Sequence, residues 1–258
     1  MESKRAILVI SFGSSIEEAR LKAIQPIEEL IKESFPNYQV ERAFTSNKII
    51  KKLKETKGLF FDTPEEGLQK LIKKGFQEII LQPLHIIPGF EFDKIKKTIM
   101  DNRSPSVEIR LGKPLLYDKI DYLKVMEALQ TQLPTIKGKQ VVLFIGHGTN
   151  HQANEHYYAL QTFLKEQGHP IIVSTLEADM DQVMMQLKEG GYTEVVLMPF
   201  LLVAGDHVQN DLLGEDEYSW KSRLTSSGYL VKAYPKGLGE NPAFQALYLQ
   251  RVQELIVR

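Results

Sequence analysis

The chain has 258 residues, of which 43% are hydrophobic and 25% charged, which is typical of a globular protein with one large domain or two smaller ones. Its 32 basic and 33 acidic side chains leave a formal net charge of -1, so no overall field attracts nucleic acid or an anionic membrane. Cysteine is absent, which excludes disulfides, thiolate metal sites and cysteine nucleophiles. Any metal site must therefore use His, Asp or Glu, and any acidic ligand needs a local basic cluster.

The N-terminal residues lead directly into the apolar run 6–10, which Ser11 and Gly13 interrupt before it reaches the length of a signal-peptide core. No stretch approaches the ~20 apolar residues of a membrane helix. We therefore expect a cytoplasmic protein whose partners include neither membrane nor nucleic acid.

Short apolar runs alternate along the chain with longer amphipathic segments, a pattern typical of βα units around a parallel sheet. The expected strands are 6–10, 38–45, 78–82, 107–111, 140–145, 171–175, 194–198 and 229–233. The expected helices are 16–34 with Ser14 or Ser15 as cap, 46–53, 63–75, one opening near 88–91, 117–133, 152–167, 180–189, a helical region from 201–211, and 242–257. A linker at 134–138 separates two sets of four strands. The sequence thus predicts an α/β protein with two similar domains, 1–135 and 136–258, each with a four-stranded parallel sheet flanked by helices.

The two halves also match weakly in sequence. Segment 7–13 (ILVISFG) aligns with 142–148 (VLFIGHG), and 67–91 aligns with 184–207 through a helix, a glycine stop and an apolar run that ends in proline. This alignment places Phe12 opposite His147 and Glu91 opposite His207. The pattern indicates a duplication in which only the second half kept a histidine at both positions.

Polar residues follow three strands of the second half. His147 comes after the first of them, Glu177 after the second and His207 in the turn after the third. Because parallel strands share their direction, the three loops fall at one edge of the sheet, where α/β proteins bind ligands. Two imidazoles and a carboxylate are a suitable set for a divalent first-row metal. The sequence therefore predicts a metal site at this edge.

Each of these residues also has a purely structural interpretation. His147 could be a hydrogen-bonded residue of a strand-to-helix turn, and Glu177 an acid favoured by a helix dipole. His207 could be a surface histidine beside Asp206, or Asp206 could orient its ring as a metal ligand. His85 lies among apolar neighbours, which favours a core or binding-site position over a ligand, and His169 before Pro170 indicates a surface turn.

A rival set lies in the segment 147–156. His147 and His151 are four residues apart, as in a helical zinc pair, and Glu155 and His156 follow. Gly146 and Gly148 instead place His147 in a turn, and the HExxH spacing of a zinc hydrolase is absent. No P-loop, GxGxxG or nucleophile elbow follows any strand, although the backbone N–H groups at 13–15 could receive a carboxylate of a ligand.

Several longer motifs together resemble one family, the single-chain sirohydrochlorin cobalt chelatases of anaerobic cobalamin synthesis, which share the ferrochelatase-like fold. The resemblance covers essentially the whole chain and rests on SFGSS at 11–15, QPLHIIPGFE at 82–91, GHGT at 146–149, LEAD at 176–179 and PFLLVAGDH at 199–207. In that family, two similar domains face each other across a cleft that holds the tetrapyrrole, and His, Glu and His side chains bind the metal.

This resemblance implies ATP-independent insertion of Co²⁺, with Ni²⁺ or Fe²⁺ as alternative metals. Carried over, the metal ligands are His147, Glu177 and His207, and the catalytic pair is His147 and Glu91. The two N-terminal motifs imply that Ser11, Gly13, Ser14 and His85 bind the tetrapyrrole. A protein that binds a metal or tetrapyrrole without turnover remains the alternative from another class, and exposed sheet edges or apolar helix faces would support a homo-oligomer.

Overall fold

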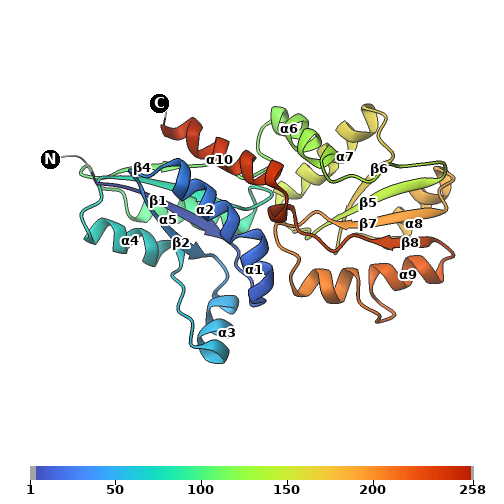
Figure 1. Ribbon diagram of the computed structural model, residues 1–258, viewed down its shortest axis with the longest axis horizontal. Helices are drawn as coiled ribbons and strands as arrows, with labels where there is room; N and C mark the ends of the chain where they lie inside the picture. The colour runs from blue at the N-terminus through green and yellow to red at the C-terminus, as the bar shows by residue number, and fades with distance from the viewer. Residues whose placement is uncertain (1–3, 257–258) are drawn as a thin grey trace.

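The computed structural model describes residues 4–256 and consists of two α/β halves placed side by side (Figure 1). Each half contains a four-stranded, fully parallel sheet, with strand order β2-β1-β3-β4 in the first and β6-β5-β7-β8 in the second. The strands are β1 (Arg5–Ser11), β2 (Gln39–Phe44), β3 (Glu78–Pro83), β4 (Glu108–Leu111), β5 (Gln140–Gly146), β6 (Ile171–Thr175), β7 (Glu194–Pro199) and β8 (Leu230–Ala233). The predicted fold class, with two sets of four parallel strands, is confirmed.

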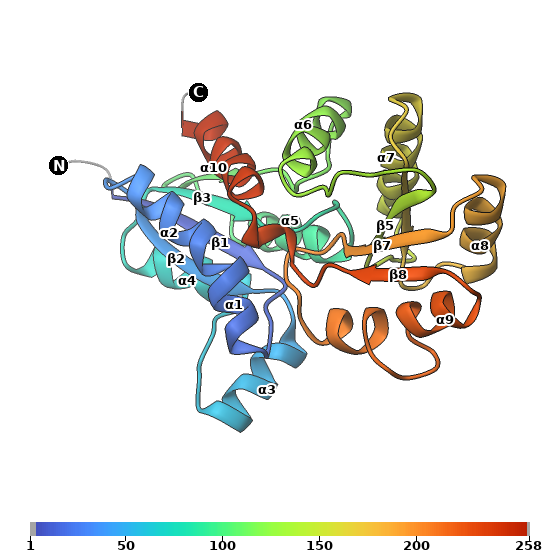
Figure 2. The same ribbon diagram turned by 45° about the vertical axis from the view of Figure 1, so that its right-hand side comes forward.

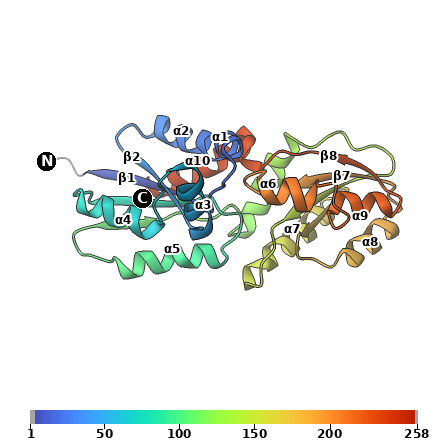
Figure 3. The ribbon, with the colours of Figure 1, turned by 90° about the horizontal axis from the view of Figure 1, so that it is seen from below.

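Helices cover both faces of the sheets, and Figure 3 shows α1 and α2 on one side of the N-terminal sheet and α5 on the other. The helices are α1 (Glu17–Ala23), α2 (Gln25–Ser34), α3 (Asn47–Lys57), α4 (Pro64–Lys73), α5 (Phe90–Asp101), α6 (Lys119–Gln130), α7 (Glu155–Glu166), α8 (Met180–Glu189), α9 (Trp220–Ser226) and α10 (Pro242–Ile256). Short 3-10 helices occur at Gln152–Asn154 and Leu238–Glu240, and a π-helical turn at Val208–Leu212.

The two halves are equivalent in register as well as in strand order. Ile10 pairs with Pro83 in the first sheet, and Ile145 pairs with Pro199 in the second. The glycines that anchor the sequence alignment, Gly13 and Gly148, have φ values of 89° and 85°, a region that L side chains rarely adopt. The turns after β1 and β5 are therefore the same structure, with Phe12 and His147 at corresponding places, as the alignment predicts.

The closing helix α10 belongs by sequence to the second half but packs on the first. It contacts α2, β3 and α6 (Figures 1 and 2), and the buried Tyr248 hydroxyl donates to the carbonyl oxygen of Leu84 at 3.0 Å. One hydrophobic cluster extends through both halves, from Phe44 to Phe144 and Tyr248. This shared core fixes how the two sheets meet, while the division at residue 135 stays a prediction.

The expected helix 16–34 is instead two helices. α1 ends at Ala23, with Ile24 as its cap, and α2 begins at Gln25, because Pro26 has no N–H to continue the first helix and suits the first turn of a new one. The cap position of α1 is Ile16 rather than Ser14 or Ser15, with the Ser14 hydroxyl accepting from the Ile16 N–H at 3.2 Å. Other bounds shift by a few residues, and the predicted helix end at Val257 lies outside the described residues.

Among the described helices, none combines the length and apolar character needed to cross a membrane.

Candidate metal and substrate site

His147 stands on a tightly packed turn at the end of β5. A Cβ added at Gly146 would lie 2.4 Å from the buried ring of Tyr157, and one at Gly148 would lie 2.9 Å from Thr175. A side chain on either side of His147 would therefore displace the Tyr157 ring of α7 or the Thr175 side chain of β6. The turn excludes His147 from the helix that follows and leaves its side chain exposed, as the glycine spacing predicts.

His207 meets His147 at this edge. Their ring centroids are 4.9 Å apart and the rings are nearly perpendicular, at 88°. His147 Nδ1 donates to the carbonyl oxygen of Gly148 at 2.9 Å, and His207 Nδ1 donates to the Asp211 carboxylate at 2.6 Å. These acceptors require a proton on Nδ1, so in the neutral form of each imidazole the lone pair is on Nε2 and can bind a metal.

The partner that orients His207 is Asp211, one helical turn further along, and not the adjacent Asp206. Asp206 instead forms an ion pair with Lys52 of α3, which belongs to the other half of the molecule; Lys52 Nζ and Asp206 Oδ2 are 3.6 Å apart. The spacing of four residues between His207 and Asp211 was the sequence signal for this contact, since side chains so separated share a helical face.

Glu177 lies in the turn between β6 and α8, exposed to solvent. Its Cβ is 3.6 Å from the position of a Cβ at Gly148, so it neighbours the His147 turn. Asp179 caps α8 and Asp181 occupies its first turn. Glu177 therefore lies before the helix and is not one of the first-turn acids that interact with the helix dipole. Within residues 4–256 no three His, Asp or Glu side chains are gathered closely enough to enclose an ion, and Glu177 stays a predicted ligand.

Glu91 and His85 form a second polar group, contributed by the first half. Glu91 is the second residue of α5, and its Oε1 accepts from Lys94 Nζ at 2.6 Å. Its Oε2 is buried with no hydrogen-bond partner in the described chain, and so is Nδ1 of His85. His85 Nε2 lies 3.3 Å from the Thr45 hydroxyl. A buried carboxylate oxygen and a buried ring nitrogen without partners are candidates for contact with a ligand.

Burial lowers the pKa of His85 to about 4, with the nearby Glu91 carboxylate acting in the opposite direction and Lys94 adding to the lowering. His85 is therefore uncharged at neutral pH, which favours a hydrogen-bonding role over a cationic one.

This lowered pKa predicts a pH-dependent contribution to stability. The unfolded chain binds a proton on His85 at pH values below ~6.5, whereas the folded protein resists it down to about 4. Folding stability should therefore fall as pH decreases through this window. We expect the free energy of unfolding to fall by about 1 to 2 kcal/mol between about pH 7 and pH 5, and His85→Gln to abolish this part of the pH dependence. Urea unfolding of both proteins at the two pH values measures it; equal pH dependence would contradict the assignment.

The turn after β1 approaches the loop that carries His207. A Cβ added at Gly205 would lie 3.5 Å from the Ser14 hydroxyl oxygen. At Gly13, a Cβ would lie 2.7 Å from the Phe44 ring, so this turn too requires glycine. Ser11 is buried, with a hydroxyl that has no partner among the described residues. Ser11, Gly13 and Ser14 thus lie at the junction of the two halves, and their contact with a tetrapyrrole stays a prediction.

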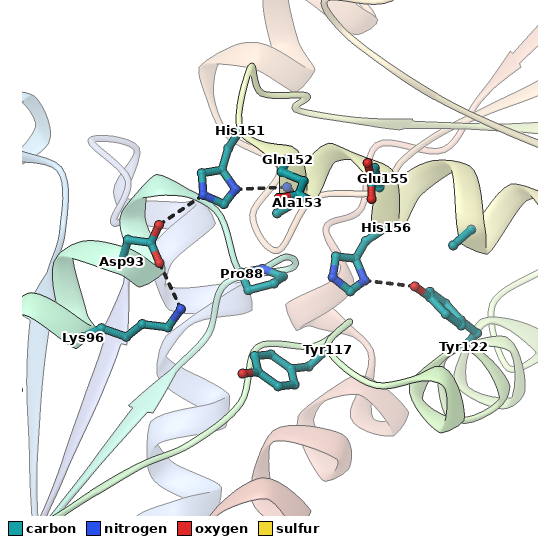
Figure 4. A pocket seen from close by; sticks show the side chains of 11 residues that line it. Pro88, Asp93, Lys96, Tyr117, Tyr122, His151, Gln152, Ala153, Glu155 and His156 are labelled. Atoms are coloured by element: carbon teal, nitrogen blue, oxygen red, sulfur yellow. Dashed lines mark hydrogen bonds and ion pairs between the residues drawn. The ribbon is translucent and has the colours of Figure 1, made fainter.

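The rival set His151, Glu155 and His156 lies around a different cavity, of about 530 Å³, between α5 and α7 (Figure 4). His151 Nε2 contacts the Asp93 carboxylate at 3.1 Å, and its Nδ1 accepts from the Ala153 N–H. His156 Nδ1 lies 2.9 Å from the Tyr122 hydroxyl (Figure 4). Both histidines are thus engaged in contacts between the halves, and neither shares a helical face with His147. Asp93, which no sequence pattern singled out, supplies one of these contacts.

Comparison with known proteins decides the family. Residues 5–257 match the family described as cobalt chelatase (CbiK). This chain belongs to the CbiK cobalt chelatase family. It is 38% identical over 255 residues to the sirohydrochlorin cobaltochelatase of Salmonella typhimurium, covering 98% of this chain and 97% of that protein. It is 31% identical over 255 residues to the sirohydrochlorin cobaltochelatase CbiKC of Nitratidesulfovibrio vulgaris, covering 97% and 90%.

Solved structures agree on the fold of this CbiK-family chain. SirB from Bacillus subtilis with Fe³⁺ superposes with a TM-score of 0.63 at 20% identity, covering 97% of this chain and 95% of that one. CbiX, described as the terminal enzyme of sirohaem synthesis in denitrifying bacteria, superposes with a TM-score of 0.51 at 15% identity, covering 97% and 99%. The chelatase-like arrangement predicted from the motifs is thereby confirmed.

Proposed function

We propose that this protein inserts Co²⁺ into sirohydrochlorin without ATP, with release of two protons, in anaerobic cobalamin synthesis. Membership of the cobalt chelatase family supports the metal and the reaction. The observation that carries the proposal is the facing pair His147 and His207, because both rings are held by Nδ1 and offer Nε2 at the junction of the two halves.

In this proposal Co²⁺ is a substrate that the two imidazoles hold only until the macrocycle takes it. Imidazole nitrogen is a good ligand for Co²⁺, and two such ligands leave coordination positions for ring nitrogens. Glu177, exposed beside the His147 turn, would supply an oxygen ligand and offset the cationic charge. An open set of this kind suits transfer better than a closed structural site.

The ring must lose two pyrrole protons as the metal enters. The unpartnered Oε2 of Glu91, at the start of α5, is the available acceptor on the N-terminal side. An imidazole can accept the other proton near neutral pH, so His147 acts as ligand and base in succession, or shares these roles with His207. His85, uncharged and hydrogen-bonded to Thr45, would contact the ring without carrying charge.

The test is the absorbance spectrum of sirohydrochlorin mixed with Co²⁺ and the purified protein, without ATP. We expect the metallated spectrum to form much faster than in a protein-free control, with many turnovers per protein. Parallel reactions with Ni²⁺ and Fe²⁺ rank the metals by kcat/KM, and faster insertion of either would replace cobalt in the proposal. Stoichiometric binding with no gain in rate would instead establish a binding protein.

A further inference from the structure

The proposed substrate is a polyanion, and the protein has no excess of positive charge to attract it. Sirohydrochlorin carries many carboxylates around its rim, whereas the protein has a formal net charge of -1. A polyanion therefore needs a local group of cations at the site, because the protein as a whole does not attract it. If the proposed function holds, on which this inference rests, such cations must lie close to His147 and His207.

Helix α3 is the most basic element near the junction. It carries five lysines against one acidic residue, Glu55, within Asn47–Lys57. It projects from the N-terminal half toward the same side of the molecule as the segment that follows β7 (Figure 2). Only Leu53 of this helix is buried, so α3 contributes little to the core for its length.

The two ends of the candidate site are both connected to α3. Its cap, Ser46, donates its backbone N–H to the carbonyl oxygen of Phe12 at 3.3 Å, and the preceding residue, Thr45, contacts His85. Six residues after Ser46, Lys52 Nζ reaches Asp206, the neighbour of His207, at 3.6 Å. The helix thus runs from the His85 and Glu91 side of the junction to the His207 side.

The lysines of α3 differ in the contacts that their side chains make within the protein. Lys51 pairs with Glu55, Lys57 pairs with Glu17, and Lys54 lies over the Phe60 ring at 5.6 Å from its centroid. These three are therefore engaged away from His207.

Lys48 and Lys52 are four residues apart and so share one face, which Lys52 turns toward Asp206. Lys48 is exposed, and no ion-pair partner for it occurs within residues 4–256. The face formed by these two lysines is called here the Lys48–Lys52 face.

We propose that the Lys48–Lys52 face binds carboxylates on the rim of the tetrapyrrole, with Asp206 occupying Lys52 until the substrate displaces it. A carboxylate of the ring would exchange for that of Asp206, so Lys52 keeps a partner in both states. Lys48, in the first turn of α3, would receive a second carboxylate near His85. These lysines are binding residues and take no part in the proton transfers.

Equilibrium binding of metal-free sirohydrochlorin, followed by its fluorescence without any metal, tests the proposal apart from catalysis. The double variant Lys48→Met/Lys52→Met should raise Kd about tenfold, since an exposed charge pair contributes a factor of about two to five. Lys73→Met/Lys74→Met is the matched control: it removes the same charge at the end of α4, which lies before β3 and hence at the opposite edge of the sheet. Its Kd should stay within about twofold of the wild type.

Two further variants sharpen the result. Lys48→Arg/Lys52→Arg keeps the charges and should bind nearly as the wild type does. Asp206→Asn frees Lys52 and should lower Kd, opposite to the loss of the lysine. Equal weakening in both lysine-to-methionine doubles, an unchanged Kd in the first, or weaker binding by Asp206→Asn would overturn the proposal. If the wild type neither binds sirohydrochlorin nor inserts cobalt, the proposed function fails. If the wild type does both and the α3 lysine variants bind with an unchanged Kd, only this inference fails.

Discussion

Replacing His147 by alanine should reduce the rate of cobalt insertion into sirohydrochlorin by about 100-fold or more, the usual loss when a residue that transfers a proton is removed. The fold should survive, because the His147 side chain is exposed and its only described hydrogen bond is to the adjacent Gly148 carbonyl. His207→Ala should have a comparable effect, since the two imidazoles form one pair.

The initial rate of the absorbance change measures this loss, with urea unfolding to verify stability. His169→Ala is a matched control: His169 precedes β6 and so lies at the edge of the sheet opposite to His147, and its variant should retain wild-type rates. A His147→Ala protein with full activity at subsaturating Co²⁺ would exclude His147 from the reaction.

The dependence on cobalt separates the two roles of His147. If it serves chiefly as a metal ligand, a high Co²⁺ concentration should recover much of the rate in His147→Ala, because the defect lies in KM for the metal. If it serves chiefly as a base, kcat should stay low at every Co²⁺ concentration and its pH profile should lose the ascending limb. Recovery at high Co²⁺ with a wild-type pH profile would assign the proton transfer to Glu91 or His207.

The inner strands were predictable because they are short apolar runs buried on both faces, whereas β4 and β8 at the sheet edges are half-buried or exposed. Residues 141–145 are fully buried, as are 6–10, and in each half the glycine turn follows directly. The order of the strands within a sheet was not predicted, although its identity in the two sheets agrees with the repeat between the halves. Helix α9 was missed because its segment is polar apart from Trp220 and Leu224, and two buried side chains at helical spacing are a weak pattern.

The site was predictable to the extent that it depends on strand ends. The meeting of His147 and His207 follows from the parallel sheet, whose strand ends share an edge. Contacts between the halves were not, since nothing local to Asp93 or Lys52 signals that His151 and Asp206 lie across from them. The return of α10 to the first sheet has the same origin: its apolar face suits either half, and only the assembled core decides.

The buried ion pair between Asp121 of α6 and Arg251 of α10 should be the most sensitive point of the fold outside the apolar core. Their side chains are 1% and 8% exposed and lie 2.5 Å apart. Asp121 also accepts from the backbone N–H groups of Tyr117 and Asp118, the two residues that precede α6. Arg251→Met would leave the Asp121 charge buried without its partner, and we expect it to lower the free energy of unfolding by about 3 to 5 kcal/mol.

Urea unfolding followed by circular dichroism measures this loss against Asp101→Asn, which removes one partner of the exposed ion pair Lys97–Asp101 and should cost less than about 1 kcal/mol. Adding Asp121→Leu to Arg251→Met should restore part of the stability, because it removes the stranded charge, although the cap of α6 is also lost. Since α6 contacts α7 and α10 packs on β3, the pair joins elements of both halves. A single variant as stable as Asp101→Asn would show that solvent reaches Asp121 and that the packing of α10 alone holds the halves together.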